Sequence, residues 1–556
     1  MRMSVRRRAA AAGLATFFVS AVPAVAHATG IAEFPDNGSE QGGRGGAWAA
    51  RARAPLAAFY NPAGLAGQPT RLVLQANTNF QNTCFTRIKA DNDPSNDGVA
   101  KGGAYPQVCS RDGAAVVPQL AMTFRLTDRI GLGIAPLLTP SGGASGVNFP
   151  QFVQVGSGPT ATYEAGPTRY MLTNANLVVL NPTIGIGVEV MDRLRLGVSF
   201  QWGIASLSFT NAVAATANTS ATMYNVAQGD IQAVAKVHDY FIPGLTAGAI
   251  YSPSDSFDIA GWYKWSNPID AEGDVTTTVG YYASTVASGK SAGGAVGNTA
   301  LANCGVTGGT NACGGGNNLH ITVQEPMEAK LGFRYHKLRH DVPYDEHVRD
   351  PMAQDIFDIE ADLTWANDST FQNLQIRFPA SPTTGDGVLP VNGITGTQTP
   401  SNADVPHEFH DVYGIRLGGD FNVLPDQLTI RGGGFFQSSG LNPQYQNVDF
   451  MASTNFGLAL GGTYRIHLSK EKHSALEVSL GFEHVFYLNE TNDGPNGLDA
   501  LAGTQCPPGA ADTTPKLSNF TCTPGGATRY RTAWAINLGT ITQSINVLNL
   551  GLGYKF

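Results

Sequence analysis

The chain has 556 residues and a formal net charge of −8, with only 14% charged residues and 66 glycines. This composition argues against a cytosolic enzyme, a coiled coil or a charged disordered protein, and the acidic balance leaves no basic surface for nucleic acid. A mean hydropathy of −0.09 is too polar for a bundle of membrane helices, so a membrane β-barrel is the class to test against the periodicity of the sequence.

The first 28 residues have the pattern of a secretory signal peptide. Met1 to Arg8 is basic, Ala9 to Val25 is apolar, and Ala26 and Ala28 supply small residues before a cleavage point. The apolar run is short for an anchor helix. We therefore predict an exported protein that is cleaved after Ala28.

Residues 29–69 precede the first predicted strand, at about 70–82, and are rich in glycine and alanine. Such a segment forms neither an apolar strand nor a soluble domain, but it suits close backbone packing inside a polar barrel. A wide barrel is not filled by its own side chains. We therefore predict that 29–69 is a hatch in the lumen and that 70–556 forms the barrel.

Many segments of the barrel region alternate apolar and polar residues, which is the period of a β-strand. Leu194 to Trp202 and Phe257 to Trp265 each place apolar residues at every second position, and the last segment does so at Leu548, Leu550, Leu552, Tyr554 and Phe556. One face of each predicted strand is therefore apolar, and the other is small, polar or charged.

The connections between these strands are of two kinds. Short turns such as 127–129 and 191–193 alternate with seven long predicted loops: 83–115, 139–169, 209–239, 273–321, 367–408, 440–450 and 490–535. This alternation is typical of an outer-membrane barrel, and a barrel leaves no unpaired strand edge in lipid. We predict an all-β, transmembrane antiparallel β-barrel of about 14 strands with both termini in the periplasm.

Six cysteines fall into three local pairs, each within a polar segment: Cys84 and Cys109, Cys304 and Cys313, Cys506 and Cys522. Local pairing is the natural prediction for loops that fold back on themselves, and disulfides fit an exported protein. Free loop thiols are the alternative. Neither a CxxC motif nor a Cys/His cluster with zinc spacing is present, so we predict no metal site.

The glycine-rich run from Gly42 to Ala47 (GGRGGA), followed by Ala57 to Leu65 (AAFYNPAGL), resembles the hatch of the FadL/TodX hydrophobic-compound transporters of Gram-negative outer membranes. Further pieces resemble that family in order: Gly166 to Tyr170, Glu272 to Asp274, Asp362 to Trp365, Leu428 to Gly433 and Asn549 to Phe556. The long loops and their cysteines depart from the family pattern.

The resemblance implies a fourteen-stranded barrel with an N-terminal hatch, located in the bacterial outer membrane. It implies passive transport of long-chain fatty acids or aromatic hydrocarbons, without any cofactor. Ligand would be captured by the loops, would bind against the hatch, and would leave sideways through the wall at a kink in the third strand. The implied partners are the hydrophobic ligand, outer-membrane lipid and the barrel-insertion machinery, for a monomeric protein.

Two groups of residues follow from this resemblance. Asn61, Pro62 and Ala63 match the family's Asn-Pro-Ala marker and are the predicted gating turn, with a plain structural turn as the alternative. The predicted third strand, Ile130 to Leu138, contains or precedes the residues expected at a lateral opening, with an ordinary strand end as the alternative: Pro136, Pro140, Gly142 and Gly143.

Charged residues at inward positions form a third group. Five cations could hold a ligand carboxylate: Lys264, Lys330, Arg334, Arg416 and Arg431. Six acidic residues face inward by the same parity: Asp258, Glu328, Asp358, Glu360, Asp362 and Glu483. We therefore favour a lumen network of neutralised pairs that grips the hatch over a dedicated ligand site.

The sequence contains no enzyme motif in a recognisable arrangement. Gly289-Lys290-Ser291 resembles the end of a phosphate loop, but Ser284 occupies the required upstream glycine position. Together with the resemblance, which implies the transported compounds, this predicts a non-enzymatic protein for passive transport of fatty acids first and aromatic hydrocarbons second. A surface adhesin and a general diffusion porin are the rival functions.

Overall fold

The structure, a computed structural model, describes residues 37–91, 93, 97–111, 113–140, 144–158, 162–213, 230–279, 300–301, 319–340, 350–378, 402–468, 474–493 and 535–556. Among these residues, no helix combines the length and the apolar character needed to cross a membrane. The predicted all-β fold is confirmed: fourteen wall strands form one closed antiparallel barrel.

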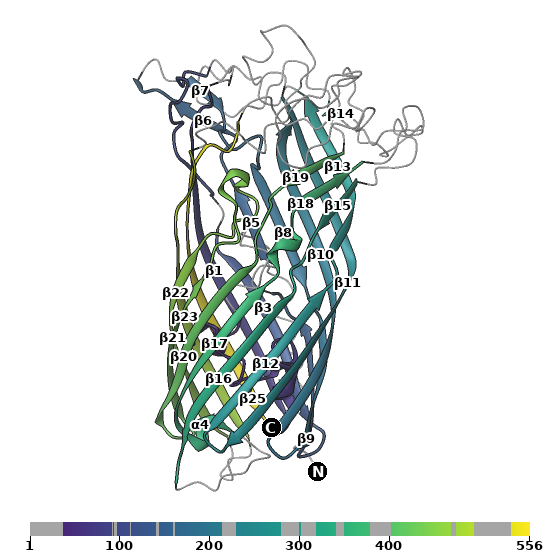
Figure 1. Ribbon diagram of the computed structural model, residues 1–556, viewed down its shortest axis with the longest axis vertical. Helices are drawn as coiled ribbons and strands as arrows, with labels where there is room; N and C mark the ends of the chain where they lie inside the picture. Colours follow the sequence, from purple (N-terminus) through teal and green to yellow (C-terminus); the bar gives the residue numbers. More distant parts are fainter. Residues whose placement is uncertain are drawn as a thin grey trace, which may run out of the picture.

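The barrel wall is built from long strands, several of them in two pieces (Figure 1). The first half of the wall contains β1 (Arg71–Arg87), β3 (Ala115–Arg125), β4 (Ile130–Leu137), β5 (Ala144–Asn148), β8 (Asn174–Leu180), β9 (Thr183–Met191), β10 (Leu194–Val213), β11 (Ile231–Ser254), β12 (Phe257–Ser266) and β13 (Ile269–Val279). The second half contains β15 (Leu319–Val323), β16 (Glu328–Leu338), β17 (Asp355–Ala366), β18 (Asn373–Arg377), β19 (Ala403–Pro406), β20 (Val412–Leu424), β21 (Leu428–Gln437), β22 (Asn455–His467), β23 (Ala475–Tyr487) and β25 (Gly539–Lys555).

Smaller elements lie at the two ends and inside the barrel. They are α2 (Ser39–Gly42), η1 (Pro55–Ala58), η2 (Pro62–Leu65), α4 (Pro351–Gln354), η6 (Asp368–Thr370), η7 (Pro443–Tyr445), β2 (Val108–Cys109), β6 (Phe152–Val155), β7 (Thr162–Ala165), β14 (Ala300–Leu301) and β24 (Glu490–Asn492). In Figure 1, β6 and β7 mark the upper end, which we call the loop end, and the C-terminus marks the lower, terminal end.

The barrel closes between its first and last strands. β1 and β25 pair along their whole lengths, from Arg71 opposite Lys555 at the terminal end to Arg87 opposite Gly539. Seventeen residue pairs join the two strands, so the seam is as continuous as the rest of the wall and no strand edge is exposed there.

The alternation predicted from the sequence describes the two faces of the wall. In β10, Leu196, Val198 and Trp202 are exposed on the outer face, whereas Arg195 and Ser199 are buried inside. In β23 the exposed residues are Val478, Leu480, Phe482 and Phe486. Since successive strand side chains point to opposite faces, an apolar outer belt and a polar lumen arise from the same two-residue period.

Five of the predicted loops were too long, because they contain paired residues of wall strands: 83–115, 139–169, 209–239, 273–321 and 367–408. The predicted loop 209–239 contains the ends of β10 and β11, which pair up to Val213 opposite Ile231, and the predicted loop 273–321 contains the end of β13. Toward the loop end the outer face no longer needs to be apolar, so the alternation disappears although the strand continues.

Residues 37–69, which we call the N-terminal segment, lie inside the barrel as short turns, drawn in purple in Figure 1. Almost every side chain in the segment is buried; examples are Arg44 and Asn61 at 0% exposure. The segment contacts opposite sides of the wall: Gly42 lies against Asn549 of β25, and Pro62 lies against Gly197 of β10. It therefore fills the lumen at this level.

A disulfide joins Cys84 to Cys109, which face each other across β1 and β2. The other four cysteines, Cys304, Cys313, Cys506 and Cys522, lie outside the described residues. The bond ties the last part of the first loop, at β2, to β1, the wall strand from which the loop starts.

Candidate functional site

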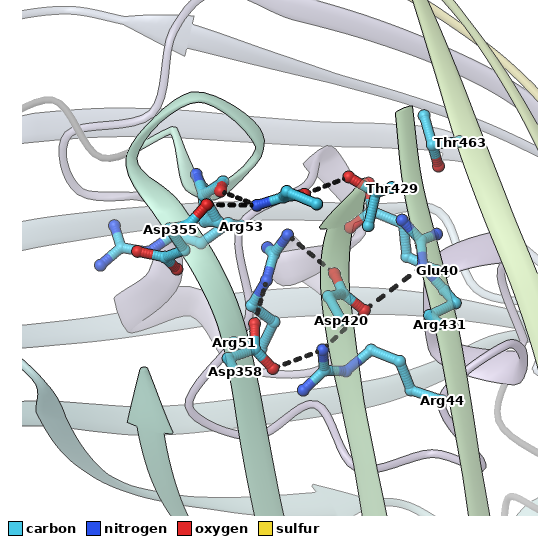
Figure 2. Close-up of polar contacts among 12 residues, drawn as sticks. Glu40, Arg44, Arg51, Arg53, Asp355, Asp358, Asp420, Thr429, Arg431 and Thr463 are labelled. Atoms are coloured by element: carbon cyan, nitrogen blue, oxygen red, sulfur yellow. Dashed lines mark hydrogen bonds and ion pairs between the residues drawn. The ribbon is translucent and has the colours of Figure 1, made fainter. Parts of the chain in front are cut away.

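The contact between the N-terminal segment and the wall centres on a buried arginine. The Arg44 guanidinium donates from Nη1 to Asp358 at 2.7 Å, and Nη1 also lies 2.8 Å from Asp420 (Figure 2). Its Nη2 donates to Glu360 at 3.1 Å. All four side chains are at most 5% exposed. Because a buried charge is costly unless it is paired, Arg44 and these wall carboxylates depend on one another.

Strand β17, which carries Asp358 and Glu360, also binds the backbone of the N-terminal segment. Asp362 accepts hydrogen bonds from the amides of Trp48 and Ala49 at 2.9 and 3.1 Å, and Glu360 accepts one from the Ala50 amide at 2.6 Å. Asp358, Glu360 and Asp362 all point inward because they are two residues apart on β17. One strand thus supplies a row of acceptors for residues 44–51.

Six acidic residues predicted to face inward are all buried: Asp258, Glu328, Asp358, Glu360, Asp362 and Glu483. The cations that the N-terminal segment contributes were not predicted. Arg51 lies 3.4 Å from Asp358 and 3.3 Å from Asp420. The signal that could have revealed these cations was Arg44, the arginine inside the glycine run.

The five wall cations that the sequence singled out do not form one cluster. Arg334 pairs with Asp258, Asp355 and Asp358, whereas Arg416 lies over the ring of Phe435 at 5.4 Å. Arg431 Nε approaches Asp420 at 3.4 Å. The structure therefore spreads these side chains around the lumen.

Lys264 and Lys330 lie beside aromatic rings of the N-terminal segment. Lys264 Nζ is 2.8 Å from Glu328 and 5.1 Å from the ring centre of Phe59. Lys330 Nζ is 6.0 Å from the ring centre of Tyr60, and the ring of Trp262 lies 5.6 Å away. Two ammonium groups thus lie against the apolar cluster of the N-terminal segment, which contains Phe59 and Tyr60.

Asn61 shapes the turn of the segment that faces the opposite wall. Its side chain accepts from the Ala63 amide at 3.2 Å, capping η2, and donates to the Ala49 carbonyl at 2.8 Å. Pro62 occupies the first position of η2, where proline is well tolerated. One side chain therefore joins the η2 turn to the stretch that β17 binds.

This turn packs against wall glycines at very short range. A Cβ atom at Gly197 would lie 2.1 Å from the Pro62 carbonyl carbon and 2.2 Å from the Ala63 nitrogen. We predict that Gly197→Ala displaces the turn and that planar bilayers containing the variant conduct ions where the wild type is closed. Gly261→Ala is the matched control, because its Cβ would meet nothing closer than 3.7 Å. A folded but silent Gly197→Ala protein would contradict the prediction.

The third wall strand is interrupted, as its prolines suggest. β3 pairs with β4 at Leu120–Leu137 and again at Met122–Ile134, so Pro136 lies in a bulge. Pro140 lies in the interruption between β4 and β5; Gly142 and Gly143 lie outside the described residues. Among the described strands, β5 pairs with β8 and not with β3.

The interruption is tied to the N-terminal segment. The Thr139 carbonyl turns inward, where it accepts from Asn37 Nδ2 at 2.7 Å and from Gln119 Nε2 at 3.4 Å. Leu138, the residue before Thr139, is 1% exposed and packs in a cluster with Leu56, Phe59 and other apolar residues of the segment. The interruption after β4 and the apolar cluster of the N-terminal segment are therefore in contact.

Apolar residues also line the lumen toward the loop end. This upper apolar cluster draws buried side chains from several wall strands and loops, among them Val179, Leu207, Val237, Ile321 and Phe371. The lumen thus has two regions: an apolar one near the loops and a charged one around the N-terminal segment. Among the described residues, no group of histidine, cysteine, aspartate and glutamate is arranged to hold a metal ion.

Several solved structures share this architecture. A Pseudomonas aeruginosa FadL homologue matches with a TM-score of 0.59 and 15% identity, covering 94% of this chain and 99% of that chain. The Pseudomonas putida toluene transporter TodX matches with a TM-score of 0.52 and 13% identity, covering 94% of this chain and 99% of that chain. The Ralstonia pickettii toluene transporter TbuX matches with a TM-score of 0.50 and 14% identity, covering 94% of this chain and 98% of that chain. At these identities the similarity shows the fold alone.

A comparison with curated proteins finds no match. A family model described as outer membrane protein transport protein (OMPP1/FadL/TodX) matches residues 19–504, which is most of the chain. The interrupted third strand, the filled lumen and this match agree, and the chain belongs to the OMPP1/FadL/TodX family of outer-membrane transport proteins.

Proposed function

We propose that this outer-membrane transporter of hydrophobic compounds carries long-chain fatty acids. The observation that supports a carboxylate-bearing ligand is the position of Lys264 and Lys330, two ammonium groups beside the rings of Phe59, Tyr60 and Trp262. A fatty acid needs an apolar path for its chain and a cation for its headgroup, and this level of the lumen has both.

In this proposal the N-terminal segment acts as the hatch, with residues 29–69 as its extent. The turn at Asn61, Pro62 and Ala63 is the gating element, because it links the Ala49 carbonyl to the glycine-lined wall. The remaining lumen cations, including Arg334 and Arg416, belong to the charge network around the hatch, in which Arg334 shares Asp358 with Arg44, and do not bind the ligand.

The exit that we propose is lateral, at the interruption marked by Pro136, Pro140, Gly142 and Gly143. The apolar cluster of the hatch adjoins the interruption through Leu138. A ligand that left there would stay among apolar atoms instead of crossing the polar plug, which is the favourable route for a hydrocarbon chain.

We further propose that the protein is made with a signal peptide that is cleaved after Ala28. Phe556 belongs to the strand that the barrel-insertion machinery recognises. The protein works as a monomer surrounded by bacterial outer-membrane lipid. Transport is passive and non-enzymatic. The three cysteine pairs, Cys84–Cys109 among them, brace the loops.

Uptake of two ligands by one strain tests the assignment. In an outer-membrane transport-deficient strain, we expect the wild type to restore labelled-oleate uptake and the Lys264→Met, Lys330→Met variant to lower it about tenfold, since a charge-assisted contact is worth about 1.5–3 kcal/mol. Toluene uptake should change little, because a neutral hydrocarbon has no carboxylate. Lys337→Met is the control; Lys337 lies on the same strand as Lys330 but is exposed.

The outcomes separate the rival functions. Toluene uptake without oleate uptake by the wild type would favour the aromatic-hydrocarbon alternative. Equal loss of both ligands in a folded variant would mean that the lysines hold the hatch and do not recognise a carboxylate. An adhesin would transport neither ligand, and a porin would conduct ions in planar bilayers.

A further inference from the structure

A second polar site lies at the terminal end of the barrel, between the N-terminal segment and the wall. It is a cavity open on one side and lined by residues of both: Glu40, Arg51, Arg53, Pro69, Arg71, Asp350, Pro351, Met352, Arg431, Arg465, Glu477 and Lys555. Six of these side chains are cationic and three are carboxylates. The lining therefore has an excess of positive charge.

The three carboxylates are already shared by three of the cations. Asp350 lies 2.8 Å from both Arg465 and Lys555, and Glu477 is 2.8 Å from Arg465 and also contacts Arg71. Glu40 lies 3.2 Å from Arg71. Burial alone would raise the pKa of Asp350, but Arg465 and Lys555 lower that pKa below its ordinary value. These carboxylates are thus ionised and engaged.

The other three cations are arginines whose donors are incompletely used. Arg431 is 5% exposed, and its Nε and Nη1 make no hydrogen bond among the described residues; the contact with Asp420 is an ion pair at 3.4 Å. Arg51 Nε is also buried without a hydrogen bond, at 3.4 Å from Asp358, while Arg51 Nη2 donates to Asp420 at 3.3 Å.

Arg53 is 7% exposed, and within the described part of the chain its side chain donates only to the Ala66 carbonyl, at 3.4 Å. Buried donors without acceptors are destabilising, so Arg431, with its Nη1 unsatisfied among the described residues, leaves room for an acceptor from outside the chain, and Arg51 and Arg53 line the same cavity.

We propose that this cavity binds a small oxyanion, a carboxylate or a phosphate, between Arg51 and Arg53 of the N-terminal segment and Arg431 of β21. The guanidinium group presents planar, paired N–H donors that match two oxygens of such an anion. The bound anion joins the segment to the wall and holds the segment in place. The site lies at the terminal end of the barrel, where its lining includes Asp350 and Lys555, and does not depend on which compound is transported.

Titration of the purified, detergent-solubilised protein tests the site with three probes: inorganic phosphate, acetate and octanoate. We expect saturable binding that weakens about tenfold or more in Arg431→Gln and in Arg53→Gln, since each removes charge-assisted donors. Arg193→Gln is the matched control, because Arg193 is an exposed arginine of a turn at the same end, paired with Asp255. Heat-modifiable gel migration establishes that each variant is folded, and Arg53→Gln removes no ion pair among the described residues.

The probes also identify the source of the anion. Equal affinity for octanoate and acetate would assign the site to free anions, and much tighter octanoate binding would assign it to the headgroup of an amphipathic ligand. Absence of saturable binding by all three probes, or binding unchanged in both variants, would overturn the proposal. Failure of oleate uptake would leave this result unaffected, because the titration measures binding alone.

Discussion

Replacing Asp358 and Glu360 with asparagine and glutamine is expected to open the barrel. Both carboxylates bind the Arg44 guanidinium, and Glu360 also accepts the Ala50 amide. Removing one partner of a buried ion pair typically costs about 3–5 kcal/mol because the other charge remains uncompensated. The loss falls on the contact between the N-terminal segment and β17, so we expect the segment to detach while the wall, which is held by its own ladders, stays closed.

The measurement is ionic conductance in planar bilayers. The wild type should be closed, and the Asp358→Asn, Glu360→Gln protein should show sustained conductance and should sensitise cells to large antibiotics. Asp192→Asn is the matched control: Asp192 also pairs with an arginine, Arg129, but its side chain is 65% exposed. Exposed pairs are worth at most about 1 kcal/mol. A folded, silent double variant would show that other contacts suffice to hold the segment.

The wall could be predicted from the sequence because lipid imposes one simple rule on it. An outer face in contact with lipid must be apolar at every second residue, so β12 and the end of β25 were recognisable from alternation alone. The rule ends where the lipid ends. β10 and β11 continue for several pairs beyond the apolar belt, to Val213 and Ile231, with nothing in the pattern to mark them.

The partners inside the barrel could be predicted only in part. Parity placed Asp358, Glu360 and Asp362 on the inner face, since each wall strand has a fixed period. The path of the N-terminal segment has no such period. The pairing of Arg44 with residues more than 300 positions away, and the inward turn of the Thr139 carbonyl, arise from tertiary packing that no local pattern encodes.

The division of the lumen explains how a plugged barrel can still carry an apolar ligand. The ion pairs bind the N-terminal segment mainly to β17 and β20, whereas the interrupted third strand faces its apolar side through Leu138. A ligand that moves along the apolar side does not have to separate charges. The strong polar contacts and the proposed exit therefore lie on different sides of the segment, and the turn at Asn61 connects them.

Changing that turn should abolish transport. We expect Asn61→Ala, Pro62→Ala to reduce labelled-oleate uptake to the background of the transport-deficient strain. Asn61 is fully buried, and its alanine variant loses both the cap on the Ala63 amide and the hydrogen bond to the Ala49 carbonyl. Loss of a cap typically costs about 1 kcal/mol, and the unpaired buried carbonyl adds about 1–3 kcal/mol, so the turn loses its fixed geometry.

Two further variants separate gating from folding. Asn61→Asp keeps the cap acceptor but loses the donor to the Ala49 carbonyl, and we expect it to fold and to transport oleate several-fold more slowly. Asn442→Ala is the control: Asn442 caps η7 in the same way, accepting from the Gln444 amide at 3.3 Å, but it lies in a loop outside the N-terminal segment. Wild-type uptake by a folded Asn61→Ala, Pro62→Ala protein would remove the turn from the pathway. The residues at 61–63 would then form a plain structural turn. Neither an adhesive barrel nor a transporter whose ligand bypasses the hatch requires the geometry of this turn.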